Sequence, residues 1–156
     1  MIKEVIGNLL DSDCDIICHQ VNCRGVMGAG LAKQIAERYP LVLNVYRNRY
    51  NKGLARLGEL DFVLATPKQI VCNMYAQDRY GRDRQYTDYE AFKDCLDGIV
   101  DFIRISEAKY NFKVNKIGFP YNIGCGLAGG DWNIVQKLIK DRFANENVAV
   151  EIYRLK

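Results

Sequence analysis

Two glycine-rich segments constrain this chain more than any other feature. Residues 25–30 read GVMGAG and residues 124–130 read GCGLAGG, and each lies between an apolar run and a segment of helical periodicity. A strand, a glycine turn and a helix in this order typically bring backbone N–H groups to a phosphate. In an open α/β sheet such turns lie beyond the carboxyl ends of strands, where ligands bind. The sequence therefore predicts one crevice bounded by two loops that suit a diphosphate.

Hydrophobic periodicity alternates between strand and helix along the chain. Pro40 is expected to end one helix and open the next, and residues 87–90, TDYE, have the form of a capping box. Asp131 is expected to cap the last helix. We expect strands over residues 1–6, 15–21, 59–65, 69–75, 116–120 and 148–153, and helices over residues 31–39, 40–51, from 87 onward and 131–144. This alternation predicts one three-layer α/β/α domain over residues 1–156.

The composition indicates which kinds of partner and which cellular compartment to expect. The 22 basic and 19 acidic residues of this 156-residue chain are mixed along it, so no basic tract follows a nucleic-acid backbone. The N-terminal apolar run is too short for a signal peptide, and no later run reaches the length of a membrane span. The six cysteines include no C-x-x-C pair and are expected to be reduced thiols. We expect a cytoplasmic protein with a small anionic ligand and no membrane partner.

Other interpretations of the glycines and cysteines are less consistent with the spacing. A dinucleotide-binding fingerprint that starts at Gly28 needs Gly or Ala at position 33, which is Lys33 in this chain. A Walker A loop is also excluded, because the chain contains no Gly-Lys-Ser or Gly-Lys-Thr sequence. Glycines that only serve tight turns remain an alternative. A zinc site would draw on Cys14, Cys18, His19 and Cys23, but their spacing matches no common structural zinc site. We therefore expect no metal.

Two separated motifs carry a resemblance to a known family. The first is the strand at residues 15–21 followed by Asn22 and MGAGLA at residues 27–32, and the second is IGCGL at residues 123–127 after a strand that ends at Pro120. The chain resembles a macro domain, in particular the branch with ADP-ribose 1''-phosphate phosphatases and terminal ADP-ribose glycohydrolases. The resemblance extends over nearly the whole chain. It implies a mixed six-stranded sheet between helices and a pocket for ADP-ribose.

The resemblance also implies which residues bind the ligand. Asp15 matches the position that accepts a hydrogen bond from the adenine amino group, and a simple turn residue is the alternative. Asn22 matches the position that contacts the distal ribose. The implied ligand loops comprise Met27, Gly28, Ala29 and Gly30 beside the distal sugar, and Ile123, Gly124, Cys125, Gly126, Leu127 and Ala128 around the diphosphate.

Catalytic residues are less clearly indicated. The phosphatase-like relatives have a histidine where this chain has His19, although a core histidine is an equally good interpretation. Glycohydrolases with a lysyl intermediate need a lysine and an aspartate where this chain has Gln77 and Ala128, so that mechanism is not expected. The candidate acids to act with His19 are Asp131, whose alternative role is an N-cap, and Asp78. The polar segment at residues 77–83 is a candidate cover for the pocket, with Asp78 or Asp83 as a general base and Arg79 or Arg82 as a phosphate ligand, and solvated surface charge is the alternative.

These observations converge on one predicted function and two alternatives. We predict that the protein binds ADP-ribose and hydrolyses ADP-ribose 1''-phosphate to ADP-ribose and phosphate, without a cofactor. Removal of ADP-ribose from a modified protein or nucleic acid is one alternative. Binding of ADP-ribose without turnover is the other.

Overall fold

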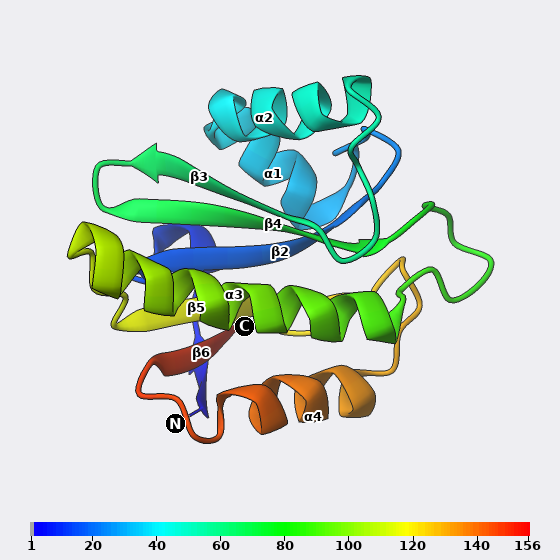
Figure 1. Ribbon diagram of the computed structural model, residues 1–156. Helices are drawn as coiled ribbons and strands as arrows, with labels where there is room; N and C mark the ends of the chain where they lie inside the picture. Colours follow the sequence, from blue (N-terminus) through cyan, green and yellow to red (C-terminus); the bar gives the residue numbers. More distant parts are fainter. Residues whose placement is uncertain (1) are drawn as a thin grey trace.

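The computed structural model describes residues 2–156 as a six-stranded sheet between two layers of helices (Figure 1). The strand order is β1-β6-β5-β2-β4-β3. The strands are β1 (Ile2–Ile6), β2 (Ile16–Asn22), β3 (Leu60–Thr66), β4 (Gln69–Gln77), β5 (Lys116–Pro120) and β6 (Ala149–Arg154). The helices are the 3-10 turn η1 (Leu9–Asp11), α1 (Gly30–Arg38), α2 (Pro40–Asn51), α3 (Tyr89–Tyr110) and α4 (Trp132–Phe143). The predicted α/β/α architecture is confirmed, and Met1 of the first predicted strand lies outside the described residues.

The direction of the strands places the ends of β2, β4 and β5 at one edge of the sheet. All neighbouring strands are parallel except β3 and β4, which form an antiparallel hairpin at one side of the sheet. Strand β2 lies between β5 and β4, so Asn22, Gln77 and Pro120 end side by side at the same edge. Both glycine loops start from this edge, as the sequence predicts.

Each face of the sheet has its own hydrophobic core. Helices α1 and α2 cover one face and α3 and α4 cover the other (Figure 1). Alternate residues of β2 feed the two cores: Ile17 and Val21 pack toward α1 and α2, while Ile16 and Cys18 pack toward α3 and α4. Cys14 and Cys23 therefore lie across the sheet from Cys18, and residues 2–156 gather no group of three metal-ligand side chains.

Two local features differ from the sequence prediction. Asp88, one residue beyond the predicted cap Thr87, begins α3, because its carboxylate accepts a hydrogen bond from the Ala91 N–H at 2.9 Å. Thr87 is buried instead, and its hydroxyl donates to the Gly124 carbonyl at 2.5 Å. The turn η1 was not predicted, and the Asn8 side chain caps it by accepting from the Leu10 N–H. Within residues 2–156 no helix is both long enough and apolar enough to cross a membrane.

Candidate functional site

Three hollows form one groove along the carboxyl edge of the sheet. The Asn22 pocket, about 360 Å³, includes Asn22, Gly28, Ala29, Gln77, Tyr80 and Arg82 in its wall. The His19 pocket, about 250 Å³, includes His19, Gln20, Gly30, Leu31, Gly126 and Ala128. The Asn8 pocket, about 340 Å³, includes Asn8, Leu31, Gln34, Tyr121 and Tyr153. Adjacent pockets share wall residues, with Ala29 and Ala128 common to the first two and Leu31 and Tyr121 common to the last two.

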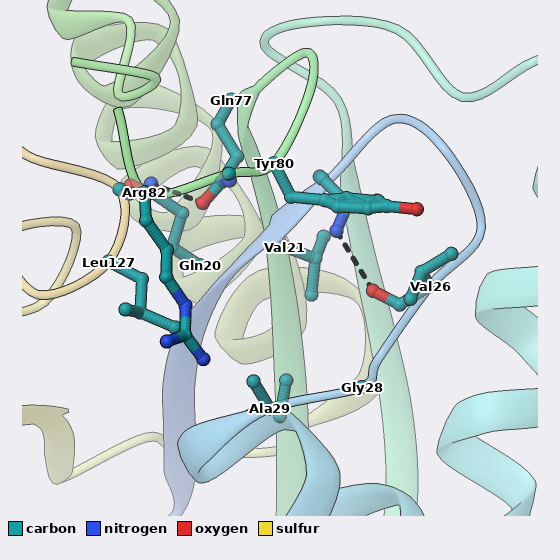
Figure 2. A pocket seen from close by; sticks show the side chains of 13 residues that line it. Gln20, Val21, Val26, Gly28, Ala29, Gln77, Tyr80, Arg82 and Leu127 are labelled. Atoms are coloured by element: carbon teal, nitrogen blue, oxygen red, sulfur yellow. Dashed lines mark hydrogen bonds between the residues drawn. The ribbon is translucent and has the colours of Figure 1, made fainter. Parts of the chain in front are cut away.

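Side chains hold the loop after β2, residues 23–29. The Asn22 amide donates to the Val26 carbonyl at 2.8 Å, a contact drawn in Figure 2, and its oxygen accepts from the Arg24 N–H at 2.9 Å. The hydroxyl of Tyr46, fully buried on α2, bonds to the Asn22 backbone and side chain and accepts from the Val26 N–H at 3.1 Å. The Asn22 side chain thus fixes its own loop, and one N–H of its amide is left for a ligand.

Backbone conformation holds the loop after β5, residues 121–131. Gly124 and Gly129 have φ angles of +73°, which residues with a Cβ adopt only under strain. A Cβ on Gly124 would come within 2.7 Å of the Gln20 side-chain oxygen, and one on Gly129 within 2.7 Å of the Arg84 carbonyl. The Ala128 carbonyl accepts from the Tyr86 N–H at 2.6 Å. The loop is therefore pressed between β2 and the segment before α3.

The N-terminus of α1 faces the groove without a cap. Its N-cap residue is Ala29, which has no side chain to accept a hydrogen bond, and the first turn carries no acidic residue. The N–H groups of Gly30, Leu31 and Ala32 therefore have no acceptor among residues 2–156. Both α3 and α4 are capped by aspartates. An uncapped helix start concentrates partial positive charge where an anion can bind.

The opposite wall of the His19 pocket also presents free donors. The backbone N–H groups of Gly126, Leu127 and Ala128 donate to no acceptor among residues 2–156, and all three residues line this pocket. The two sets of donors belong to elements far apart in the sequence, and their residues line one cavity. This arrangement can hold a diphosphate without any charged side chain.

The structure places His19 on β2 beneath this pocket. The side chain is 2% exposed, and burial lowers the pKa of the imidazole from 6.5 to about 4. Its Nε2 lies 2.5 Å from the Asn73 side-chain oxygen, while its Nδ1 is buried and has no partner. His19 is therefore neutral at pH 7 and has no proton to give from an imidazolium.

Asp15 is not brought to the groove. It precedes β2, seven residues before Asn22, so it lies at the opposite edge of the sheet, about 23 Å away at the rise of an extended strand. Its carboxylate accepts from the backbone N–H groups of Asn115 and Lys116 at 2.8 and 3.0 Å and so orders the start of β5. This placement corrects the expectation that Asp15 binds adenine.

The two candidate acids also lie outside the three pockets. The Asp131 carboxylate accepts from the Asn133 N–H at 2.9 Å and caps α4, which is the alternative role that the sequence left open. Asp78 pairs with the Arg24 guanidinium at 2.8 Å on the surface. Neither contacts His19, so the predicted pairing of His19 with one of these acids is corrected: the described residues place no carboxylate in the wall of the Asn22 or His19 pocket.

The ligand loops are brought together as predicted in most positions but not in all. Met27 is buried in the core with α1 and α2, and the Cys125 thiol turns to the Ile123 carbonyl. Burial raises the pKa of Cys125 to about 11, so this thiol is protonated at pH 7. The remaining loop residues line a pocket: Gly28, Ala29, Gly30, Ile123, Gly124, Gly126, Leu127 and Ala128.

Several residues of the groove were not identified from the sequence, among them Asn8 and Gln20. Asn8 directly follows β1, which is parallel to β6, so a polar residue after the first strand was a usable signal. Gln20 carried no such signal, whereas Tyr80 lies in the polar segment at residues 77–83 that the sequence indicates as a cover for the pocket. Figure 2 shows Tyr80 and Arg82 extending over the Asn22 pocket from the loop after β4, with the Arg82 guanidinium directed toward Ala29. Arg82 has no acidic partner within residues 2–156.

Comparisons with known proteins show which enzymes and solved structures this chain is similar to. No family model matches the chain. It is 28% identical over 148 residues to a DNA ADP-ribosyl glycohydrolase of Mycobacterium tuberculosis, covering 92% of this chain but only 39% of that protein. The solved macrodomain of DarG from the same organism superposes with a TM-score of 0.82 at 26% identity, covering 100% of this chain and 99% of that one. An ADP-ribose 1''-phosphate phosphatase of Aspergillus oryzae is 38% identical over 52 residues, which are 33% of this chain and 26% of the phosphatase.

Proposed function

Because this chain has the macrodomain fold, we propose that its groove binds ADP-ribose and that a group attached to the distal ribose is removed there by hydrolysis. The observation that carries the binding proposal is the pair of donor sets in the His19 pocket. The uncapped start of α1 and residues 126–128, whose N–H groups are free, line the same pocket and suit the two phosphates of a diphosphate.

The two flanking pockets give the ligand a direction. The Asn8 pocket presents the Asn8 amide, whose oxygen is used by η1 and whose N–H groups are free, next to the aromatic rings of Tyr121 and Tyr153. A planar ring with nitrogen acceptors, such as adenine, fits these groups. The Asn22 pocket at the other end holds the distal ribose, with one N–H of the Asn22 amide directed to it. Asn8 therefore replaces Asp15 in our assignment of the adenine end.

The Asn22 pocket extends beyond the space for one sugar and includes an unpaired cation. Arg82 suits a phosphate on the distal ribose, and Gln20, Gln77 and Asn22 supply further polar groups. On this basis we propose ADP-ribose 1''-phosphate as the substrate. Water then cleaves the phosphate ester to give ADP-ribose and inorganic phosphate, and Arg82 stabilises the negative charge on the departing phosphate.

One observation favours an alternative without turnover. The wall of the Asn22 pocket contains neither a carboxylate nor a lysine among residues 2–156. By the resemblance, Gln77 matches the position of the lysine nucleophile. A protein that binds ADP-ribose and releases it unchanged needs none of these groups. The relatives named as DNA ADP-ribosyl glycohydrolases favour a third possibility, in which the removed group is a nucleotide of DNA.

Calorimetric titration with ADP-ribose, followed by assays of phosphate release and of ADP-ribose release, separates the three. Binding with phosphate release from ADP-ribose 1''-phosphate supports the proposal. Binding with release of ADP-ribose only from a modified DNA oligonucleotide supports the glycohydrolase. Binding without either product supports the reader, and no binding overturns all three.

Arg82→Gln tests the substrate assignment within the same samples. The charge change should weaken binding of ADP-ribose 1''-phosphate by about tenfold, equal to about 1.4 kcal/mol, and leave ADP-ribose binding nearly unchanged. Arg79→Gln is the matched control, because Arg79 lies in the same loop outside the pocket walls and near the Asp78 carboxylate. Equal losses for both ligands would show that Arg82 does not contact the added phosphate.

A further inference from the structure

The Asn8 pocket presents hydrogen-bond donors to a base but few acceptors. No aspartate or glutamate among residues 2–156 lines this pocket. Adenine carries an amino group at its 6-position, which donates hydrogen bonds, whereas hypoxanthine and guanine carry an oxygen there, which accepts them. The polar atoms in the wall therefore decide which purines this end of the groove accepts.

The Asn8 amide presents its NH₂ group to a ligand. Its Oδ1 accepts from the Leu10 backbone N–H at 3.0 Å. Because a backbone N–H only donates, the amide atom that meets it must be the oxygen, and the NH₂ group is left on the other side of the amide. Asn8 is an exposed residue of the pocket wall, and its NH₂ group donates to no acceptor among residues 2–156. Asn8 therefore offers two N–H donors to a base.

Arg154 adds positive charge to the same wall. Its guanidinium carbon lies 4.5 Å from the centre of the Tyr121 ring, and both residues line the pocket. The side chain is 53% exposed, and its one ion pair within residues 2–156, with Glu4 Oε1, is long at 3.5 Å. A guanidinium only donates hydrogen bonds, and its charge attracts the partial negative charge of a keto oxygen. Arg154 therefore favours an oxygen over an amino group on the base.

The acceptors that could select adenine are largely occupied by the protein itself. Backbone carbonyls that already accept an N–H of the chain belong to Asn8, Leu9, Pro120, Tyr153 and Arg154. The Tyr153 hydroxyl donates to the buried Glu151 carboxylate at 2.6 Å, so Tyr153 contributes its ring to the pocket. The Gln34 amide has no partner among residues 2–156 and can turn either its oxygen or its NH₂ group to a base. Gln34 therefore does not discriminate between the two kinds of purine.

We infer that the base end of the groove accepts purines with an oxygen at the 6-position at least as readily as adenine, and that Asn8 is the specificity-determining residue. The inference rests on the proposed binding of ADP-ribose. Stacking on Tyr121 and Tyr153 does not distinguish these purines, because they are planar ring systems of the same size. The ligand class thus widens from ADP-ribose to the diphosphate riboses of 6-amino and 6-oxo purines.

Calorimetry with two ligands tests the inference. They are ADP-ribose and its hypoxanthine analogue, in which an oxygen replaces the 6-amino group of the base and the rest of the molecule is unchanged. We expect the parent protein to bind the analogue no more than about threefold more weakly than ADP-ribose. A larger preference for ADP-ribose overturns the inference and leaves the proposed function intact. Absence of binding by both ligands overturns the proposed function and the inference together.

Asn8→Asp tests the role of the residue. One carboxylate oxygen keeps the cap on η1, for which Asp and Asn serve equally well, and the other replaces the free NH₂ group by an acceptor. The preference for ADP-ribose over the analogue should rise by about tenfold, because the carboxylate accepts from the amino group and repels the keto oxygen. The ratio of the two affinities cancels the repulsion between the new charge and the diphosphate, which both ligands share.

Asn133→Asp is the matched control for this variant. It adds the same charge in the first turn of α4, outside the walls of the three pockets, and should leave the ratio of the two affinities unchanged. A ratio that is unchanged in Asn8→Asp, or that changes equally in Asn133→Asp, would show that Asn8 does not contact the base.

Discussion

The loops after β2 and β5 border the same groove but keep their shapes by different means. The first is tied by side chains at two positions, since Asn22 bonds to the backbone of Arg24 and Val26 and the buried Tyr46 hydroxyl accepts from the Val26 N–H. The second is shaped by glycines at positive φ, and its N–H groups at residues 126–128, which line the His19 pocket, are left without acceptors. The comparison teaches that a loop held either by a few side-chain bonds or by glycine conformation keeps backbone donors free, and free donors in a pocket wall are what a diphosphate needs.

The start of α1, where the first loop ends, offers the strongest test of this comparison. Ala29→Asp places a carboxylate at an N-cap whose backbone is already extended, with φ −148° and ψ 157°. We expect the free energy of unfolding to rise by about 1 kcal/mol. ADP-ribose binding should fall on the order of 1000-fold, about 4 kcal/mol, because the new carboxylate takes the free N–H groups and repels the phosphates.

Ala29→Asn is the matched control for this change. It caps the helix with a neutral side chain of the same size, so it should stabilise the fold similarly and weaken binding much less. Urea denaturation and calorimetry give both quantities. Unchanged ADP-ribose affinity in Ala29→Asp would remove the α1 N-terminus from the binding site.

The buried His19 on β2 is expected to make the free energy of unfolding depend on pH. The pKa of His19 is about 4 in the folded protein, below its ordinary value of 6.5. Between these values the unfolded chain binds more protons than the folded chain, so stability falls as the pH falls from about 6.5 toward 4. The full loss is about 3 kcal/mol, and the contribution is fully present above pH 6.5.

Denaturation midpoints across this pH range, compared between the parent and His19→Gln, isolate the effect. Glutamine retains an N–H donor for Asn73 but does not titrate. The variant should therefore lose less stability than the parent below pH 6. Parallel pH curves for the two proteins would mean that His19 is not buried in its neutral form.

Tyr46→Phe tests the side-chain half of the comparison. The change removes one hydroxyl that bonds to Asn22 and Val26, and leaves their buried groups unpaired, which should cost about 2 kcal/mol of stability. ADP-ribose binding should change far less than in Ala29→Asp, since the hydroxyl does not face the ligand. A Tyr46→Phe protein of parental stability would show that this loop does not depend on the tyrosine.

Substitutions at two glycines test whether backbone conformation holds the loop after β5. Gly124→Ala introduces a Cβ at φ +73° and 2.7 Å from Gln20, and should cost about 1–2 kcal/mol of stability. Gly126→Ala meets no atom within 4 Å and should leave stability within about 0.5 kcal/mol of the parent. Thermal unfolding of both proteins gives the comparison, and equal effects would contradict the account of how this loop is held.

Local sequence patterns were enough to predict the fold and the loops but not the ends of the groove. Both glycine turns and the elements around them follow from periodicity and from Pro40 and Asp131, which act over a few residues. The error at Asp15 arose because the resemblance was matched to this residue as the adenine position, although strand direction puts it at the far edge. The place of Asn8 and the contact of His19 with Asn73 depend on pairings of β1 with β6 and of β2 with β4, which no short segment encodes.

The central claim is that backbone N–H groups from two distant segments hold the diphosphate, and amide NMR during an ADP-ribose titration tests it most directly. We predict that the amide signals of Gly30, Leu31, Gly126, Leu127 and Ala128 move together with the binding curve, in the direction of stronger hydrogen bonding. Amides near Asp15 should stay still. Saturation with ADP-ribose that leaves these five signals unmoved, or that moves only those around Asp15, would contradict the account.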